Sequence, residues 1–448
     1  MQQITLDKGL DIPISGEPSR TVTDSRPIKH VALVGDDYID MKPTMLVNVG
    51  DHVAYGQPLF TDKKNEGVIF TAPGSGEVVA INRGAKRKFE SLVIRLEGNE
   101  AISFCEPDTD PGDLSSEALQ ELLIKSGLWC GLRTRPYGKI PRVNSKPASL
   151  FVTAIDSSPL GPDMDEIIEL HKDDFLRGLK ALTKCVQSPV YLCLETGQKT
   201  IDESIEAVDS VEFSGPHPVG LPSTHIHFLN PVSETKTAWH IGAQDVIAIG
   251  GLFCSGKLSV ERIVALAGPA VKDPRHVRTR LGASIAELCE DEISEADVRL
   301  LSGSVLDGRQ VDQIRGYLGR YHQQISCLEE GDGRQFFGWL RPGGDRFSVT
   351  RAFWSSFSKP GRLPLNTAVW GGNRAIFPLG TYEKVMPLDM VPVYLLKSLA
   401  SGNTERAKEL GCLELIEEDL ALCSYVCPGK NDFGPILRET LTSIELEG

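Results

Sequence analysis

Short apolar runs separated by glycine turns fill residues 28–98 and restrict this part of the chain to β structure. The runs cover residues 31–34, 45–53, 56–60, 67–81 and 91–98. Runs of this length bounded by Gly and Asp are typical of strands joined by tight turns. The segment therefore predicts a small unit of consecutive short strands.

The same segment contains V-x-V-G-D-x-V-x-x-G-Q-x-L at 47–59 and A-P-x-S-G-x-V at 72–78. This signature resembles the barrel-sandwich fold of biotinyl and lipoyl carriers, in which Lys63 would lie near the hairpin tip that carries the swinging arm. The stretch from Lys63 to Pro73 is longer than a carrier hairpin needs. We therefore expect Lys63 to be solvated and unmodified, and an intact mass distinguishes the two cases.

The whole chain is too long for one hydrophobic core: 448 residues predict about three domains. Its 41% hydrophobic and 24% charged residues exclude the disordered and fibrous classes. A formal charge of −14 argues against nucleic acid as the main partner, because a phosphate backbone requires a basic face.

No segment predicts a membrane span. The longest apolar stretch, 246–253, is far shorter than the ~20 residues needed, and the polar start from Met1 to Leu10 does not resemble a signal peptide. Ten cysteines, mostly scattered singly in apolar context as at Cys185, Cys193, Cys254 and Cys327, favour buried cytosolic thiols over a disulfide framework.

The pattern changes along the chain and predicts a multi-domain protein of α/β and α+β class. A linker rich in Pro, Gly, Asp and Ser covers 108–115 and separates the strand-rich range 1–107 from an alternating α/β range, 116–275. A strand–helix–strand pattern of the β-grasp kind occupies 276–332, and 333–448 combines a mixed segment with short helices. Within the α/β range, strands are expected at 149–155, 189–194, 224–229 and 245–252, with helices after residue 115 and at 175–182.

The strongest chemical pattern is C-x3-C-P at Cys423 and Cys427. A bacterial-type four-iron cluster uses C-x2-C-x2-C-x3-C-P, because four thiolates must converge on one cubane. The two missing ligands would stand at 417 and 420, which are Glu417 and Leu420. We interpret the pattern as a vestigial cluster motif with two buried thiols; a cluster shared with another subunit is the alternative.

Together these features resemble the NqrA family, whose members are subunits of the Na+-translocating NADH:quinone oxidoreductases and are related to RnfC-type subunits and to the flavin-binding subunit of respiratory complex I. The resemblance covers essentially the whole chain. Its most distinctive stretches are 8–14 (KGLDIPI), 126–129 (SGLW), 133–136 (RTRP), 213–218 (FSGPHP) and 382–390 (YEKVMPLDM). It implies a barrel-sandwich hybrid, a Rossmann-like α/β domain, a β-grasp domain of the SLBB type and a helical C-terminal domain.

The chain departs from its flavin-binding relatives at the loop that would hold the flavin. They open the α/β domain with G-x-G-G-A-G-F-P-T, whose backbone N–H groups close on a phosphate. The corresponding segment here, 128–136 (LWCGLRTRP), keeps only Gly131. In those relatives a strand near the flavin ends in an acidic segment of the N-A-E-C-E-P type. The corresponding segment here, 153–159 (TAIDSSP), keeps one carboxylate, Asp156. We therefore expect the flavin site to be closed.

The resemblance implies a peripheral subunit without a transmembrane helix, at the cytoplasmic face of the bacterial inner membrane. The complex oxidises NADH, reduces ubiquinone and pumps Na+. FAD, FMN, riboflavin and iron–sulfur centres are expected in partner subunits, and this chain is expected to bind no cofactor and to catalyse nothing alone. Its expected partners are ubiquinone and the other subunits of the complex, above all the integral-membrane quinone and flavin subunit. The alternative is a flavin- or cluster-binding electron-transfer subunit of an RnfC-like complex.

A local basic and aromatic loop, 129–142 (WCGLRTRPYGKIPR), is the first candidate for contact with quinone or a partner. A quinone head group requires an apolar slot, an aromatic ring to stack on and hydrogen-bond donors for its carbonyls. Pairing of the basic residues with acidic groups of a partner, or with lipid headgroups, is the alternative. The candidates are Trp129, Arg133, Arg135, Tyr137 and Lys139, with Tyr38 in 31–41 as a second, weaker position.

Three histidines within a short stretch, His217, His225 and His227, raise the question of a metal site. On a strand His225 and His227 would share one face, but no carboxylate or thiolate stands at convincing spacing. We expect strand histidines with ordinary hydrogen bonds and no metal. A further cluster at 351–357 (RAFWSSF) is interpreted as core or as a surface for a partner.

Overall fold

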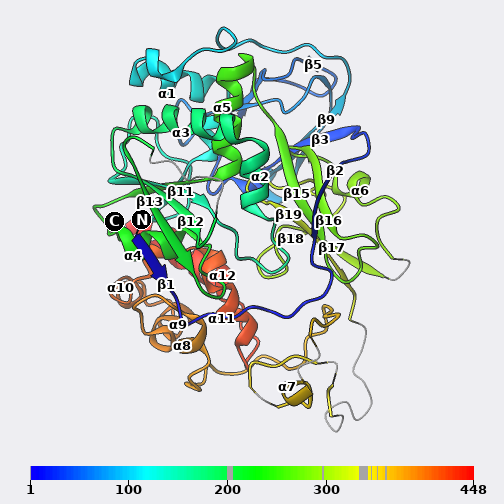
Figure 1. Ribbon diagram of the computed structural model, residues 1–448, viewed down its shortest axis with the longest axis vertical. Coiled ribbons are helices and arrows are strands. Elements are labelled where there is room, and N and C mark those ends of the chain that lie inside the picture. Colours follow the sequence, from blue (N-terminus) through cyan, green and yellow to red (C-terminus); the bar gives the residue numbers. More distant parts are fainter. Residues whose placement is uncertain are drawn as a thin grey trace.

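The computed structural model describes residues 2–198, 205–294, 297–331, 342–344, 346–350, 352–358 and 361–447. Four sheets and a C-terminal group of helices make up this part of the chain. Figure 1 shows the C-terminal helices at the lower end of the molecule and the helices α1 (Ser116–Lys125), α3 (Lys172–Val186) and α5 (Ala243–Ser255) at the upper end.

The strand-rich unit consists of two small sheets packed face to face on a shared core. One sheet has the order β3-β9-β8-β5 and the other β4-β6-β7. Their bounds are β3 His30–Val34, β4 Pro43–Met45, β5 His52–Val53, β6 Pro58–Asp62, β7 Ile69–Thr71, β8 Gly76–Arg83 and β9 Phe89–Leu96. Leu59, Phe60 and Phe70 are almost completely buried between the sheets, as the strand pattern predicts.

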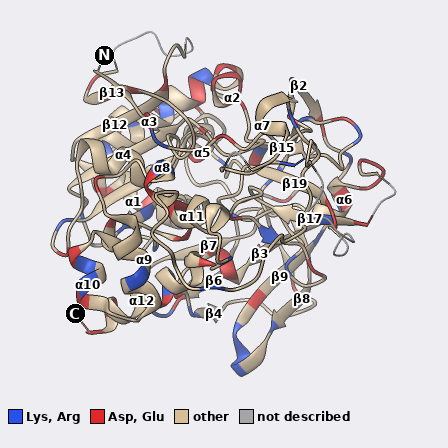
Figure 2. Cartoon of the chain, turned by 90° about the horizontal axis from the view of Figure 1, so that it is seen from below, with Lys and Arg blue, Asp and Glu red and all other residues tan. Residues whose placement is uncertain are grey.

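Two hairpins of this unit carry exposed basic tips. Lys63 and Lys64 lie exposed directly after β6, and Lys64 pairs with Asp40. The longer β8–β9 hairpin projects from the body of the molecule with Lys and Arg at its end (Figure 2), around the 3-10 turn η2 Ala85–Arg87.

The α/β unit is built on a six-stranded sheet in the order β1-β13-β12-β11-β14-β10, in which all neighbouring strands are parallel except β10 and β14. Its strands are β1 Gln2–Thr5, β10 Arg133–Arg135, β11 Ser149–Ala154, β12 Val190–Glu195, β13 Val208–Ser214 and β14 Ala238–Gly242. Its helices are α1 Ser116–Lys125, α2 Met164–Leu170, α3 Lys172–Val186, α4 Pro222–Leu229 and α5 Ala243–Ser255, with the 3-10 turns η3 Pro111–Asp113 and η4 Leu128–Gly131.

Two of the strands predicted for this unit are wrong. Residues 224–229 belong to α4, which begins at Pro222, and residues 245–252 belong to α5. Runs this short do not distinguish a helix from a strand by their periodicity, so a buried helix has the same pattern as a buried strand. Helix α5 is buried along 243–253 and packs so closely on α3 that a Cβ at Gly250 would lie 1.7 Å from the carbonyl oxygen of Asp174.

The β-grasp unit has a six-stranded sheet in the order β18-β17-β19-β15-β16-β2 and one short helix, α6 Ile285–Leu288. Its strands are β2 Ser19–Asp24, β15 Glu261–Ala267, β16 Arg275–Arg280, β17 Val298–Ser302, β18 Arg309–Gln310 and β19 Gln324–Glu329. The strand-rich sequence range 1–107 thus supplies β1 to the α/β sheet and β2 to this one, and β15 comes from the range 116–275. These exchanges tie the units together.

The C-terminal helices form a separate apolar core around Leu395, Leu396, Leu437 and Leu441, all completely buried. The elements are α7 Ser355–Ser358, α8 Tyr382–Val385, α9 Pro392–Ala400, α10 Thr404–Glu409, α11 Ala421–Val426 and α12 Phe433–Glu447, with the 3-10 turns η6 Cys412–Glu414 and η7 Glu417–Leu420. Across the described ranges, none of the helices combines the length and apolarity that a bilayer span requires.

Candidate functional site

A polar cavity of about 490 Å³ lies where the α/β unit, the β-grasp unit and the C-terminal helices meet. Thr153 and Gly242 place it at the carboxyl ends of the parallel strands β11 and β14, the usual ligand position in open α/β sheets. Its lining includes four arginines and several carboxylates: Asp37, Arg133, Asp156, Asp245, Arg262, Asp307, Arg309, Arg320, Glu417 and Glu418.

Among the residues that line this cavity, Arg133 and Tyr321 form the pair best suited to bind a ligand. The Arg133 guanidinium, on β10, lies 4.4 Å from the centre of the Tyr321 ring, which belongs to the loop before β19. The Tyr321 hydroxyl donates to the carbonyl oxygen of Cys130 at 2.8 Å, which fixes the ring. Burial raises the pKa of Tyr321, so the phenol stays protonated. A planar aromatic face and a cation therefore line the same wall.

Gly131 is the one glycine in the segment 128–136, and other side chains fill the space beside it. A Cβ there would lie 3.0 Å from Nη2 of Arg320 and 3.1 Å from Cγ of Asp245. The Asp245 carboxylate, in the first turn of α5, accepts from Arg262 at 2.5 Å and from Arg320 at 2.7 Å. An ion pair of the chain's own residues thus occupies the space beside this loop.

Arg135 is completely buried and is used within the protein. Its Nε donates to Ser223 Oγ at 2.9 Å, and its Nη2 donates to Glu418 at 3.0 Å. Nη1 lies 2.7 Å from Nε2 of His240, whose pKa is lowered by burial and by the neighbouring arginine. His240 is therefore neutral and accepts this bond. The predicted contact residue Arg135 links β10 to the C-terminal helices instead of facing the cavity.

Three other candidates, Trp129, Tyr137 and Lys139, lie outside the cavity lining. Trp129 is 2% exposed, donates from Nε1 to the carbonyl oxygen of Pro141 at 3.0 Å and packs edge-on against Trp239. The carbonyl oxygen of Tyr137 accepts from Arg438 at 2.8 Å, and Lys139 pairs with Asp40 and Glu445.

Tyr38 lies behind the cavity wall. Its buried ring meets Phe70 edge-on at 4.7 Å and Tyr321 at 6.4 Å. Of the six predicted residues, the structure brings Arg133 to the cavity lining and Tyr38 against its Tyr321 wall. Tyr321, Arg309 and Arg320 were missed, because the short strand β18 and the loop before β19 in which they lie carry no local motif.

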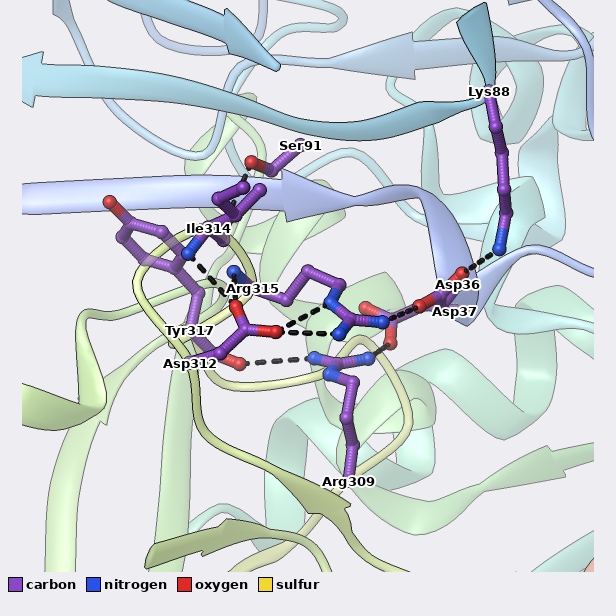
Figure 3. Close-up of polar contacts among 9 residues, drawn as sticks. All are labelled: Asp36, Asp37, Lys88, Ser91, Arg309, Asp312, Ile314, Arg315 and Tyr317. Atoms are coloured by element: carbon purple, nitrogen blue, oxygen red, sulfur yellow. Dashed lines mark hydrogen bonds and ion pairs between the residues drawn. The ribbon is translucent and has the colours of Figure 1, made fainter. Parts of the chain in front are cut away.

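A network of charged side chains fixes the rim of the cavity (Figure 3). Asp36 and Asp37, in the 3-10 turn η1 Gly35–Asp37, accept from Arg315 at 2.9 Å and from Arg309 at 2.5 Å, and Lys88 reaches Asp36 at 2.6 Å. These bonds join the strand-rich unit to the β-grasp loops, so the cavity depends on the packing of the units.

Family models match three parts of the chain: the NqrA N-terminal barrel-sandwich hybrid domain over residues 4–97, the NqrA second alpha/beta domain over 114–258, and the NQRA C-terminal domain over 263–313. A relative from Yersinia pseudotuberculosis serotype I, the NqrA subunit of its Na(+)-translocating NADH-quinone reductase, is 50% identical over 446 residues, which cover 99% of this chain and 100% of the relative. The chain belongs to the NqrA family.

The corresponding subunits of the Na(+)-translocating NADH-quinone reductases from Hahella chejuensis and Tolumonas auensis are 52% and 51% identical over 448 residues, covering 99% of this chain and 100% of each relative. The family predicted from the sequence is thereby confirmed, as is the predicted fold class: a barrel-sandwich hybrid, an α/β domain, an SLBB-type domain and a helical C-terminus.

In this member of the family, Cys423 and Cys427 lie in and directly after α11, and both are almost completely buried. Burial raises the pKa of Cys423 to about 12. At Cys427 burial acts in the same direction, but hydrogen bonds from Tyr382 Oη at 3.1 Å and from Asn431 outweigh it and lower the pKa.

The two positions that would complete a cluster motif are used otherwise. The Glu417 carboxylate receives two bonds of 2.6 Å from Arg438, and Leu420 is completely buried in the C-terminal core.

His225 and His227 are not on a strand, contrary to the prediction. His225 and His227 belong to α4, and His217 precedes it. His225 lies 2.9 Å from the carbonyl oxygen of Val219, and His227 lies 2.7 Å from Glu414. His217 lies 2.9 Å from the hydroxyl of Ser157. Among the residues that the structure describes, no group of three or more His, Cys, Asp or Glu is placed to hold a metal ion.

Proposed function

We propose that this chain is the peripheral subunit of a Na+-translocating NADH:ubiquinone oxidoreductase that binds the ubiquinone head group in the inter-domain cavity and contributes to assembly of the complex. The relatives' name supports the reaction, and the Arg133–Tyr321 wall of the cavity is the observation that carries the binding site.

The cavity has the size, the aromatic ring and the hydrogen-bond donors that a quinone head group requires, although its lining is polar. Its volume of about 490 Å³ lies within the usual range for small-molecule sites. A quinone ring stacks on an aromatic face, and its two carbonyls accept hydrogen bonds. Tyr321 supplies the face, while the guanidinium groups of Arg133 and Arg309 line the same space and can donate.

We assign no flavin and no cluster to this chain; FAD, FMN, riboflavin and iron–sulfur centres belong to partner subunits in this proposal. Two observations support it. The Asp245–Arg320 pair lies where a flavin phosphate would approach Gly131, and the Glu417–Arg438 pair and buried Leu420 replace two cluster ligands. The alternative, a flavin- or cluster-binding subunit of an RnfC-like complex, requires a purified chain with visible absorption.

We place the chain at the cytoplasmic face of the bacterial inner membrane, where its main partner is the integral-membrane quinone and flavin subunit. In this arrangement Na+ transport belongs to the assembled complex, and the chain catalyses nothing alone. The ten cysteines are free thiols, which fits a reducing compartment. Seven of them are buried, but Cys254 is exposed, contrary to the prediction.

The test is a titration of a water-soluble ubiquinone analogue into the isolated chain and into the assembled complex. Saturable binding by the isolated chain supports a site formed by this chain. Binding in the complex alone supports a site completed by a partner. Absence of saturable binding in both contradicts the proposal.

A further inference from the structure

The segment from Arg346 to Tyr382 differs in charge from the rest of the chain. It contains no Asp or Glu, although the whole chain has a formal charge of −14. Its basic residues are Arg346, Arg351, Lys359, Arg362 and Arg374, and two of the five tryptophans, Trp354 and Trp370, lie in it. A positive, aromatic stretch in an acidic protein indicates a partner with the opposite charge.

The same segment exposes an unusual amount of apolar surface. Six of the largest exposed hydrophobic side chains of the described residues fall between residues 354 and 379: Trp354, Phe357, Val369, Trp370, Phe377 and Leu379. Trp354 is 64% exposed and Phe357 is 73% exposed. Soluble proteins seldom leave large aromatic side chains grouped in water unless the surface binds something.

Contacts within the segment gather these side chains into one surface, which we call the aromatic–basic surface (Arg346, Trp354, Phe357, Trp370, Arg374 and Lys430). The rings of Trp354 and Phe357 are 6.1 Å apart. The guanidinium of Arg346 lies 4.3 Å from the centre of the Trp370 ring and 5.9 Å from that of Phe353, the residue before Trp354. A Cβ at Gly371 would lie 3.0 Å from the side chain of Lys430, so this lysine adjoins Trp370.

The surface is anchored on the folded body. Phe347 stacks on Tyr425 of α11 at 6.5 Å, the backbone N–H of Leu363 donates to Pro13 at 2.7 Å, and that of Arg374 donates to Gly429 at 3.0 Å. Figure 1 shows α7, which carries Phe357, at the lower extremity of the molecule, away from the α/β and strand-rich units. The exposed rings therefore lie at an end that a flat partner can reach.

We propose that the aromatic–basic surface docks on the headgroup region of an anionic lipid bilayer. Trp and other aromatic rings favour the membrane–water interface, and Arg and Lys beside them bind lipid phosphates. Cytoplasmic loops of integral-membrane proteins are themselves rich in Lys and Arg, so a basic surface complements lipid better than those loops. The inference rests on the membrane location in the proposed function but needs neither quinone nor the other subunits.

The test is flotation of the full-length chain with vesicles of neutral phosphatidylcholine and with vesicles in which about one third of the lipid is anionic phosphatidylglycerol. We expect binding to the anionic vesicles only, weakened by salt. The double substitution W354S/F357S should lower the bound fraction at least about ten-fold, because two aromatic side chains no longer leave water. R374E/K430E should lower it by roughly five-fold or more for each position.

Two controls separate this surface from others. Y394S removes a ring on α9 that is 62% exposed, close to the exposure of Trp354, and should leave binding unchanged. K86E/R87E removes the basic tip of the β8–β9 hairpin and should also leave binding unchanged.

Equal binding to neutral and anionic vesicles, no binding to either, or loss of binding only in K86E/R87E would overturn the proposal. So would a W354S/F357S chain that binds vesicles normally but no longer joins the membrane subunits, since the surface would then contact protein. Failure of quinone binding leaves this result untouched, so the two proposals fail separately.

Discussion

The guanidinium of Arg133 lies 4.4 Å from the centre of the Tyr321 ring, although the two residues come from different folded units. Arg133 is on the antiparallel edge strand of the α/β sheet, and Tyr321 precedes a central strand of the β-grasp sheet. Their contact exists because the two units pack against each other. The cavity that they line is therefore sensitive to changes at the interfaces as well as to changes in its own lining.

One interface depends on a buried cation. Replacing Arg135 by Ala leaves Glu418 without its 3.0 Å partner and removes donors from Ser223 and His240. Removing one member of a buried charge pair costs about 3–5 kcal/mol. We expect a loss of this size in denaturant unfolding followed by circular dichroism. R83A, at an exposed position of β8, should change stability by less than about 0.5 kcal/mol. A loss below about 1 kcal/mol in R135A contradicts the role given to Arg135.

The close approach of α3 and α5 depends on a missing side chain. G250A would place a Cβ 1.7 Å from the carbonyl oxygen of Asp174 and force the helices apart. Overpacking of this kind costs about 1–3 kcal/mol or more, although Ala is the better helix former by about 1 kcal/mol. Thermal unfolding should therefore show a lower midpoint for G250A. The matched variant G372A meets no atom within 4 Å and should unfold like the unmodified chain. Equal midpoints for the two variants would contradict this packing.

Helices α4 and α5 also show where sequence patterns reach their limit. The strands β11 and β12 and the helix α3 were predicted because strands, helices and Gly or Pro boundaries alternate there. Residues 245–252 were assigned to a strand because a run buried on all sides loses the 3.6-residue period. Helix α5 is buried by its packing against α3 and against the sheet, and the pattern of residues 245–252 does not contain these contacts.

The buried histidines should make the fold sensitive to acid. Burial lowers the pKa of His225 to about 3 and of His217 to about 4. Each is neutral in the folded chain, whereas the unfolded chain binds a proton at each below about pH 6.5. Stability is thus fully present above that pH and falls as the pH drops toward 4, by about 1.4 kcal/mol per pH unit for each histidine.

The variant H225Q tests this slope, because Gln can still donate to the carbonyl oxygen of Val219 but does not titrate. Between about pH 6 and pH 4 the unfolding free energy of H225Q should fall less steeply than that of the unmodified chain. The two slopes should differ by about 1.4 kcal/mol per pH unit, which corresponds to one proton. An unchanged slope in H225Q would show that His225 is not held neutral.

The vestigial motif should not bind a cluster. Anaerobic incubation with ferrous iron and sulfide should leave the purified chain colourless, because Cys423 and Cys427 alone supply two of four ligands and Glu417 is paired with Arg438. The measurement is the visible absorption and the iron content after desalting. A stable brown protein with about four irons per chain would contradict this assignment.

The candidate site was predictable only in part. Arg133 was found because it stands in a basic, aromatic loop, but its neighbours in that loop, Trp129 and Arg135, are buried. Composition does not show which side of a loop faces the core. Tyr321 and Arg320 come from another unit, and their position depends on inter-domain packing, which no spacing in one segment reveals.

The most direct test of the proposed quinone site is the variant Y321L in the assembled complex. Titration with a ubiquinone analogue should show an affinity at least about ten-fold weaker than that of the unmodified complex, because the stacking face and the cation–π partner of Arg133 are both lost. The Y321L chain should co-purify with the other subunits in the same stoichiometry as the unmodified chain, which reports intact assembly. Unchanged quinone affinity in Y321L, with the same subunit stoichiometry, would contradict the proposal that this cavity binds the quinone head group.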